Sequence, residues 1–429
     1  MYVYRNSDLP PDPHFPANLK DLGYSITEND LIRQTRNPEE GFRYRINRND
    51  RFNVKQREAM NGMPSLITPF MGRNLTEASY TECIRQIVVH RLEEAGLETL
   101  CLPLKDSPGE ISIPSSDPHV PILVSKNLAS ASRIILVFGE PTQDLGIWAY
   151  RSVGQDGINF GSAVNFTKAV LGERTNRTGT ALILANTGQL LWHHATSRAV
   201  SQQTWMAADR PAGNWGPATM TYRNKISGNK TWSEHIEYVF EHVLFPLLGE
   251  KSRVDVIGMA EGGQGALEYL QKRWPVWKPY ISGICLADPL QSTSVDLDMS
   301  GLTDPTSFVA FLASRCRAYV LSQDELGTRQ SLYQNYGCNC YASGERLNCE
   351  CIIPHAWPNM LDWLDLLYKD RSYVEPVVIM PEVLDETTCQ ELDEIAVKSD
   401  DVDGIDDQKD EDVNEETAAV DQELEKEEN

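Results

Sequence analysis

The sequence predicts a three-layer α/β domain, in which helices cover both faces of a mostly parallel sheet. Short apolar runs typical of buried strands recur from residue 120 onward. Between them lie longer segments whose apolar residues have the spacing of an amphipathic helix. Because strands that alternate with helices usually pair in parallel, this order favours a parallel sheet between two helical layers. Functional residues in such sheets lie at the carboxyl ends of the strands.

Six runs are short and rich in aliphatic or β-branched residues, and we expect each to form a strand. They are residues 120–124, 133–138, 180–185, 253–257, 280–286 and 317–321. The segments with helical spacing are residues 83–97, 162–171, 233–248, 263–273 and 356–368. In the third of these, Ser233 is the expected N-cap, because Glu234 and Glu237 suit the first turn that follows it.

The chain has 429 residues and a net charge of −23, which is concentrated at its C-terminal end. Residues 381–429 contain 21 acidic and 3 basic side chains and no aromatic residue. Such a tail cannot bury enough apolar surface to offset its ordering entropy, so we predict that it is disordered. Residues 1–50 are polar and contain several prolines, and we expect them to form an arm packed on a body of residues 51–380.

The remainder of the chain is close to neutral, which excludes a generally basic nucleic-acid-binding protein. No apolar segment has the length of a membrane span, and the first residues lack the apolar region of a secretory signal. We therefore expect an intracellular protein without membrane association, whose nine cysteines are mostly reduced.

The predicted strand 253–257 runs directly into Gly258-Met-Ala-Glu-Gly262 and then into a helix. This context is typical of the G-x-S-x-G nucleophile elbow of α/β-hydrolases, whose glycines permit a sharp turn beneath an exposed nucleophile. The apex residue here is Ala260, and a methyl group cannot attack a carbonyl. Glu261 is acidic but stands one residue beyond the apex. We interpret the motif as a degenerate elbow, with a simple tight strand–helix turn as the alternative.

An elbow nucleophile works with an acid and a histidine that follow it in chain order. Asp324 and Glu325 follow the predicted strand 317–321, and His355 precedes the last predicted helix. Asp324 and His355 are therefore candidate relic partners of Ala260, although a purely structural role for His355 beside the helix is favoured. The sequence Phe138-Gly-Glu-Pro141 stands where the oxyanion loop belongs and lacks the HGGG-type motif of esterases.

Four cysteines lie within 14 residues, namely Cys338, Cys340, Cys349 and Cys351. Four thiolates can hold zinc in a tetrahedron, but the C-x-C spacing matches zinc-binding patterns less well than C-x-x-C does. The alternation of Cys349 and Cys351 predicts that both point to the same face of a strand. We favour a hairpin around residues 343–344 with the cysteines packed inside it, and we expect no metal and no other cofactor.

Several longer pieces of the sequence occur together and in order in one known family. They are residues 15–24 (FPANLKDLGY), 42–50 (FRYRINRND), 57–61 (REAMN), 143–151 (QDLGIWAYR), 161–164 (GSAV), 286–289 (LADP) and 342–345 (ASGE). On these pieces the chain, from about residue 8 to 380, resembles the argonaute-binding (Arb-type) domain proteins of fungi. The same domain follows the catalytic domain of fungal class-two histone deacetylases and occurs in a metazoan nuclear homologue.

The resemblance implies an α/β-hydrolase-like fold and a role in gene silencing guided by small RNA and in heterochromatin formation. It implies argonaute or other silencing-complex proteins as partners, with RNA contacted indirectly, in the nucleus and cytoplasm. A histone deacetylase, or histones bound through the acidic tail, are further candidate partners. Because Ala260 replaces the nucleophile, the sequence favours a non-catalytic scaffold, a pseudoenzyme. The alternative is an esterase-like hydrolase that works without a serine, through Glu261, Asp324 and His355.

Residues 62–81 separate two pieces that are adjacent in the family, Arg57-Glu-Ala-Met-Asn61 and the helix that begins near Glu82. Proline and glycine within the segment oppose a continuous helix, so it is predicted to loop out. It is either a surface insertion, which loops tolerate well, or an unspliced short intron whose removal would keep the reading frame.

Overall fold

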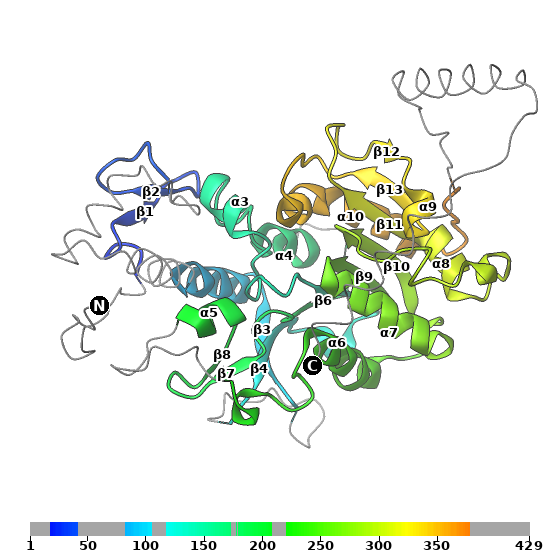
Figure 1. Cartoon of the computed structure of the whole chain (residues 1–429), viewed down its shortest axis with the longest axis horizontal. Coiled ribbons are helices and arrows are strands. Elements are labelled where there is room, and N and C mark those ends of the chain that lie inside the picture. Colours follow the sequence, from blue (N-terminus) through cyan, green and yellow to red (C-terminus); the bar gives the residue numbers. More distant parts are fainter. Residues whose placement is uncertain are drawn as a thin grey trace, which may run out of the picture. The chain divides into compact units, whose positions relative to one another are not determined.

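A computed structural model of the chain describes residues 18–41, 82–104, 117–172, 177, 179–207 and 220–377 (Figure 1). The predicted segment 62–81 and the predicted tail 381–429 lie outside the described residues. None of the described helices is long and apolar enough to cross a membrane.

The described body is built around one nine-stranded sheet with the order β12-β13-β11-β10-β9-β5-β6-β4-β3 (Figure 1). The strands are β3 (Leu97–Leu102), β4 (Val120–Ser125), β5 (Arg133–Phe138), β6 (Thr180–Ala185), β9 (Arg253–Met259), β10 (Ile281–Ala287), β11 (Cys316–Val320), β12 (Arg329–Gln330) and β13 (Asn339–Ala342). Six neighbouring strands pair in parallel, namely β6, β5, β9, β10, β11 and β13. In contrast, β4 is antiparallel to both of its neighbours, β3 and β6.

This strand order defines the fold as α/β-hydrolase-like. Apart from the short edge strand β12, the strands lie in the order first, second, fourth, third, fifth, sixth, seventh and eighth along the chain. In register, Phe138 of β5 is opposite Gly258 of β9, and Met259 is opposite Ala287 of β10. The loops that follow β5, β9 and β10 therefore leave the sheet at the same level, which is where functional sites of such sheets lie.

Helices cover both faces of the sheet. The helices of the described residues are a helix over residues 82–94, α3 (Tyr150–Gln155), α4 (Val164–Leu171), α5 (Gln202–Ala207), α6 (Trp232–Tyr238), α7 (Glu261–Trp277), α8 (Phe308–Arg315), α9 (Tyr333–Tyr336) and α10 (Ile352–Lys369), of which α3 packs on β2 (Ile32–Gln34) and α5 on a separate short hairpin. One apolar core packs helix 82–94, α4 and α10 on one face, with Val88, Phe166 and Leu364 buried there. A second core packs α6, α7 and α8 on the other face, with Leu270 and Leu312 buried there.

Several boundaries differ from the sequence prediction. The expected helix 83–97 ends at residue 94, because Gly96 turns the chain with a φ of 104° and β3 begins at Leu97. The expected helix 233–248 is divided into α6, a π-helical segment (Val239–Leu244) and a 3-10 turn (Phe245–Leu247). Pro246 cannot donate a backbone hydrogen bond, so the regular helix does not continue through it. Thr231, not Ser233, caps α6 by accepting a hydrogen bond from the Glu234 amide.

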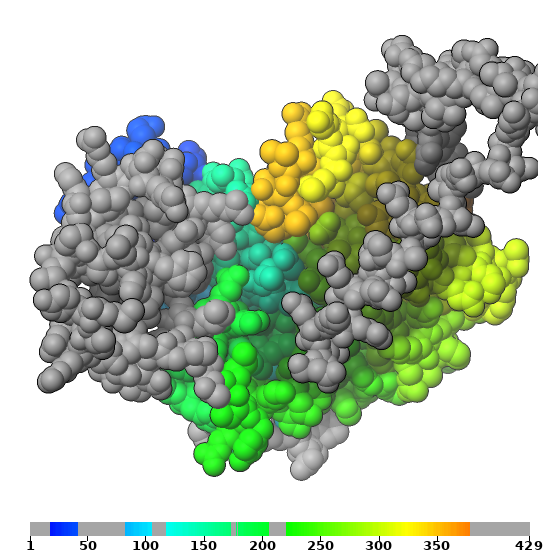
Figure 2. Space-filling model, in the orientation of Figure 1, coloured from blue at the N-terminus to red at the C-terminus, as the bar shows by residue number. Residues whose placement is uncertain are grey.

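Residues 18–41 lie on the body beside α3, as the blue segment in Figures 1 and 2 shows. They form a hairpin of β1 (Tyr24–Ile26) and β2 (Ile32–Gln34). The Asp30 carboxylate between the two strands accepts hydrogen bonds from Arg91 Nη1 and from the Asn159 amide, each at 2.7 Å. Ile32 is fully buried in the core that contains helix 82–94. The hairpin is therefore held by both a charged contact and an apolar one.

The last described residues, 371–377, pack against β11 and β13, near the end of the sheet that is formed by β12. Glu375 is 1% exposed, and its two carboxylate oxygens share the single N–H of Arg317 Nε, at 2.8 and 2.9 Å. It also accepts a hydrogen bond from the hydroxyl group of Tyr341 on β13. The guanidinium of Arg317 lies 4.4 Å from the centre of the Tyr341 ring. This segment completes the packing around β11 and β13.

Candidate functional site

The turn between β9 and α7 has the strained geometry of a nucleophile elbow. Ala260 adopts a φ of 46° and a ψ of −124°, in a region that residues with a side chain rarely occupy. A methyl group on Gly258 would lie 2.3 Å from Gly263 Cα, and one on Gly262 would lie 2.3 Å from Gly139 O. Only glycine permits these approaches, so the sharp turn accounts for the glycines of the motif. The elbow is thus retained with alanine at its apex.

Three other segments converge on the elbow. The loop after β5 brings Glu140, the turn after β10 brings Asp288, and a 3-10 turn (Cys349–Cys351) brings Cys349 and Glu350. Glu261 and Glu350 lie close enough to Glu140 for their negative charges to raise its pKa, and they act on Asp288 in the same way. Asp288 also shares a side-chain hydrogen bond with Cys349. The residues around the apex are therefore predominantly acidic.

The protonation states of this cluster follow from burial. Burial raises the pKa of Asp288 and of Glu140, and the neighbouring acids raise both further. Burial, with the charges of Asp288 and Glu350, raises the pKa of Cys349 to about 11. Because only the thiolate is an effective nucleophile, Cys349 is inert at neutral pH. This protonated thiol thus lies in the segment between β13, the last parallel strand, and α10.

In the structure, the side chains of the two predicted relic partners make their hydrogen-bond, ion-pair and ring contacts with residues outside the elbow turn. His355 lies inside the first turn of α10, not in a loop before it, because the 3-10 turn at Cys349–Cys351 leads directly into that helix. The Nε2 atom of His355 is 3.6 Å from Glu345 Oε2, and its ring packs edge-on against the ring of Phe160. Asp324 is exposed and accepts a hydrogen bond from Gln330 at 2.8 Å. Within the described residues, no hydrogen bond or ion pair joins either side chain to residues 258–262.

The four clustered cysteines separate into two pairs. Cys338 and Cys340 are buried in the core beside α7 and α8, at β13. Cys349 and Cys351 lie on a 3-10 turn, not on a strand, so the prediction of a common strand face is wrong. The Cys351 thiol accepts a hydrogen bond from Ser152 Oγ at 3.3 Å. In the described part of the chain, no group of three or more His, Cys, Asp or Glu residues has a metal-binding arrangement.

A cavity lies next to the elbow, between the loop that follows β5 and the loop that follows β6. It is small: the space inside it that a water molecule can occupy is about 20 Å³, enough for one or two waters. It is lined by Val137, Gly139, Glu140, Gln143, Asp144, Leu145, Gly146, Ile147, Trp148, Leu184, Ala185, Asn186 and Thr187. The two loops are tied together, since Thr187 Oγ1 donates to Gly139 O at 2.7 Å and Gln189 Oε1 accepts from the Leu145 amide at 3.1 Å.

The cavity lining was not identified by the reasoning from motifs, which looked for nucleophiles and metal ligands. The signal was nevertheless present, since residues 143–151 are one of the pieces that carry the family resemblance. Gln143, Asp144 and Trp148 from this piece line the cavity. These acid, amide and indole side chains match no catalytic pattern. Their place in the cavity lining depends on how the loop folds, which no short motif records.

The fold and the site together define an α/β-hydrolase-like protein whose elbow lacks a nucleophile. The model of the Arb2 domain matches residues 15–326, which is more than half of the chain. The chain therefore belongs to the Arb2 domain family, and the resemblance predicted from the sequence is confirmed.

Among solved structures, the esterase Est22 is 12% identical, with 70% of this chain and 89% of that chain covered and a TM-score of 0.30. The peroxisomal α/β-hydrolase Lpx1 from Saccharomyces cerevisiae is 10% identical, with coverages of 72% and 98% and a TM-score of 0.30. A bacterial heroin esterase is 14% identical, with coverages of 56% and 70% and a TM-score of 0.23. No curated protein matches the chain significantly. The likeness to these structures is too low to bear on function, and the fold assignment rests on the strand order.

Proposed function

We propose that this Arb2-domain protein is a non-catalytic adaptor, in which a degenerate hydrolase fold serves as a binding surface. The observation that carries the proposal is Ala260 at the apex of an otherwise intact elbow, with its φ of 46°. Backbone strain of this kind costs of the order of 1–3 kcal/mol and persists where the surrounding structure imposes it. In an esterase that strain presents a nucleophile, whereas here it presents a methyl group.

The chemistry around the apex supports the same conclusion. Acyl transfer needs a nucleophile, a base within hydrogen-bond reach and donors for the oxyanion. Cys349, in the place of the base, keeps its proton because its pKa is raised to about 11. The loop that carries Glu140 stands in the place of the oxyanion loop and lacks the HGGG-type motif of esterases. The apex therefore lacks a nucleophile, and the thiol near it is not a base at neutral pH.

The proposed setting is a silencing complex that contains argonaute. Membership of the Arb2 domain family supports argonaute-related partners in general. The proposal adds that the protein works in gene silencing guided by small RNA and in heterochromatin formation, in the nucleus and cytoplasm, and that it contacts RNA only indirectly. The acidic residues 381–429 are proposed to favour a basic partner such as a histone or a histone-deacetylase complex.

Two measurements test the proposal. The full chain should show no labelling by a fluorophosphonate probe and no turnover of p-nitrophenyl acetate above the rate without protein. Co-purification from the native cell with mass spectrometry should recover argonaute. Turnover that disappears in the His355→Ala variant would support the hydrolase alternative instead, and recovery of no silencing protein would reject the proposed setting.

A further inference from the structure

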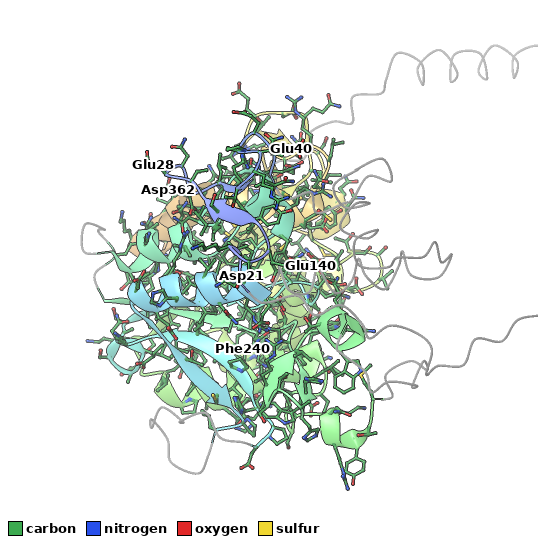
Figure 3. All side chains as sticks on the ribbon, turned by 90° about the vertical axis from the view of Figure 1, so that its left-hand side faces the viewer. Asp21, Glu28, Glu40, Glu140, Phe240 and Asp362 are labelled. Carbon is green, nitrogen blue, oxygen red and sulfur yellow. The ribbon has the colours of Figure 1, made fainter. Side chains whose placement is uncertain are left out.

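One stretch of the chain after β6 is nearly free of acidic residues. Residues 186–233 contain five Lys or Arg and two His, but only one acid, Asp209. Their balance of +4 contrasts with the net charge of −23 for the whole chain. Figure 3 labels acidic side chains elsewhere on the body, among them Glu140 in the loop after β5 and Asp362 on α10. The stretch can therefore present a locally positive surface on an acidic protein.

Two described parts of this stretch lie side by side. The strands β7 (Leu191–His193) and β8 (Arg198–Val200) pair as a hairpin that is separate from the nine-stranded sheet (Figure 1). A 3-10 turn (Tyr222–Asn224) lies beside the hairpin, because Lys225 forms a β-bridge with Leu191. The hairpin and the turn are therefore two parts of one surface.

This surface carries exposed aromatic, thioether and basic side chains. Tyr222 is 79% exposed and Met220 is 46% exposed. The guanidinium group of Arg223 lies 6.0 Å from the centre of the Tyr222 ring. Arg223 and Lys225 are exposed and form no ion pair with a described residue, and His194 is exposed on the hairpin beside them. We call these five side chains the aromatic–basic surface.

The backbone beneath the aromatic–basic surface is held by buried groups. Asn224 is buried, and its Nδ2 donates a hydrogen bond to Trp192 O at 3.1 Å. His194 Nε2 donates to Arg223 O at 3.0 Å, which joins the hairpin to the 3-10 turn. Trp192 and Ile226 are buried together in a small apolar core. A surface whose backbone is held in this way loses little conformational freedom on binding, which favours affinity.

The composition of the surface indicates a protein partner. Tyrosine, arginine and methionine are enriched at protein–protein interfaces, and truncation of tyrosine or arginine there often costs the most binding energy. Because the surface has cations and no carboxylate, a complementary segment is acidic. A nucleic acid fits less well, since its binding depends on the charge of many phosphates and this chain is strongly acidic as a whole.

We propose that the aromatic–basic surface binds an acidic segment of a partner protein. An apolar side chain of that segment packs on Tyr222, and its carboxylates pair with Arg223 and Lys225. This inference rests on the proposed adaptor function, because it names the surface and the chemistry by which the adaptor recognises a partner. The ring supplies most of the affinity, and the charges set orientation and the rate of association.

The test is a fluorescence-anisotropy titration of the full chain with a labelled peptide in which leucine and phenylalanine are flanked by aspartate and glutamate. The control peptide has asparagine and glutamine in place of the acids. In about 50 mM NaCl we expect the acidic peptide to bind at least about tenfold more tightly than the control, and its affinity to fall as salt is added. Equal affinity for the two peptides would overturn the assignment. Tighter binding of a single-stranded RNA of about 12 nucleotides would overturn a protein partner.

Matched variants locate the binding. Tyr222→Ala should weaken binding of the acidic peptide at least about tenfold, because it removes the ring that the peptide covers. Leu347→Ala truncates a side chain that is 83% exposed in the loop after β13, and it should change binding less than about twofold. Arg223→Gln should weaken binding and its dependence on salt, whereas Arg346→Gln, at another exposed arginine, should do neither. Unchanged binding in either variant of the surface would reject the site.

Recovery of argonaute from the native cell separates this inference from the proposed function. If the native chain and Tyr222→Ala recover argonaute equally, only the assignment of the surface is overturned. If the native chain recovers no silencing protein, the proposed setting fails, and the peptide titration still decides whether the surface binds acidic segments. Esterase turnover would overturn the adaptor function itself, whichever peptide the surface binds.

Discussion

The buried His235 should make the protein lose stability in mild acid. His235 is fully buried in α6, between Asn186, in the loop that follows β6, and Asn229, in the chain that precedes the helix. Its Nδ1 donates to Asn229 Oδ1 at 2.6 Å, and its Nε2 accepts from the Asn186 amide at 3.1 Å. The bond from the Asn186 amide requires the neutral ring, because a protonated ring has no acceptor. Burial accordingly lowers the pKa of His235 to about 3.

The magnitude follows from proton linkage. In the unfolded chain the histidine pKa is about 6.5, so between pH 6.5 and about 3 the unfolded state binds a proton that the folded state does not. The free energy of unfolding therefore decreases by about 1.4 kcal/mol for each unit by which the pH is lowered within that interval. The stability is fully present above pH 6.5. At pH 4.5 the loss should be about 3 kcal/mol, a large part of a typical domain's stability.

The assay is urea unfolding at pH 7.0 and pH 4.5 for the native chain and for His235→Gln. Glutamine has one donor group and one acceptor group on its amide and does not titrate. The free energy of unfolding of the variant should therefore fall by about 3 kcal/mol less between pH 7.0 and pH 4.5 than that of the native chain. Asp144 and Asp255, whose pKa values burial raises, act in both proteins and cancel in the comparison. His90→Gln is the control, because His90 lies on the exposed side of helix 82–94. Equal losses in the native chain and His235→Gln would refute the reasoning.

Three further predictions concern the elbow and the tail. Ala260→Ser should fold and remain unlabelled by a fluorophosphonate probe, because Phe138-Gly-Glu-Pro141 lacks the oxyanion motif of esterases and His355 pairs with Glu345. An intact oxyanion site is worth about 10²–10³ in rate, so labelling would show that the site is otherwise complete. Gly262→Ala should lower the free energy of unfolding in urea by about 3 kcal/mol, since its methyl would lie 2.3 Å from Gly139 O. Gly249→Ala, whose methyl would meet nothing nearer than 3.8 Å, should cost less than about 1 kcal/mol, and equal losses would contradict the packing argument. Deletion of residues 385–429 should shift the thermal midpoint by less than about 2 °C, and a larger fall would mean that the tail packs on the body.

Strands buried on both faces could be predicted almost to the residue. The expected strands 133–138 and 180–185 coincide with β5 and β6, because every one of their residues is buried and continuous apolar runs record that environment. The strand Leu97–Leu102 was not predicted, and its first residue was included in the expected helix 83–97, since half of the strand's residues are only partly buried and its pattern is mixed. The strand Asn339–Ala342 contains an asparagine and a cysteine and gave no strand signal, although all four of its residues are buried.

The site was predictable only where local backbone geometry dictates residue type. The glycines of the elbow are required by contacts within a few residues, so the sequence identified Ala260 at the apex. Cys349 and Asp288 meet through the tertiary fold, 61 positions apart, and no short pattern records such a meeting. His355 was chosen for its place in the chain order, but a boundary error of four residues at the start of α10 moved it from loop to helix.

The edge segment held by Glu375 has a consequence for where this protein can be divided. The family match ends at residue 326, yet β13, α10 and the buried Glu375 all follow it. A fragment that stops at 326 would leave β11 as an open sheet edge and would uncover the core on which α10 packs. The domain as defined by shared sequence is thus shorter than the domain that can fold alone. A protease that trims the native chain should therefore leave a resistant product ending after residue 377, and a fusion partner is best joined there.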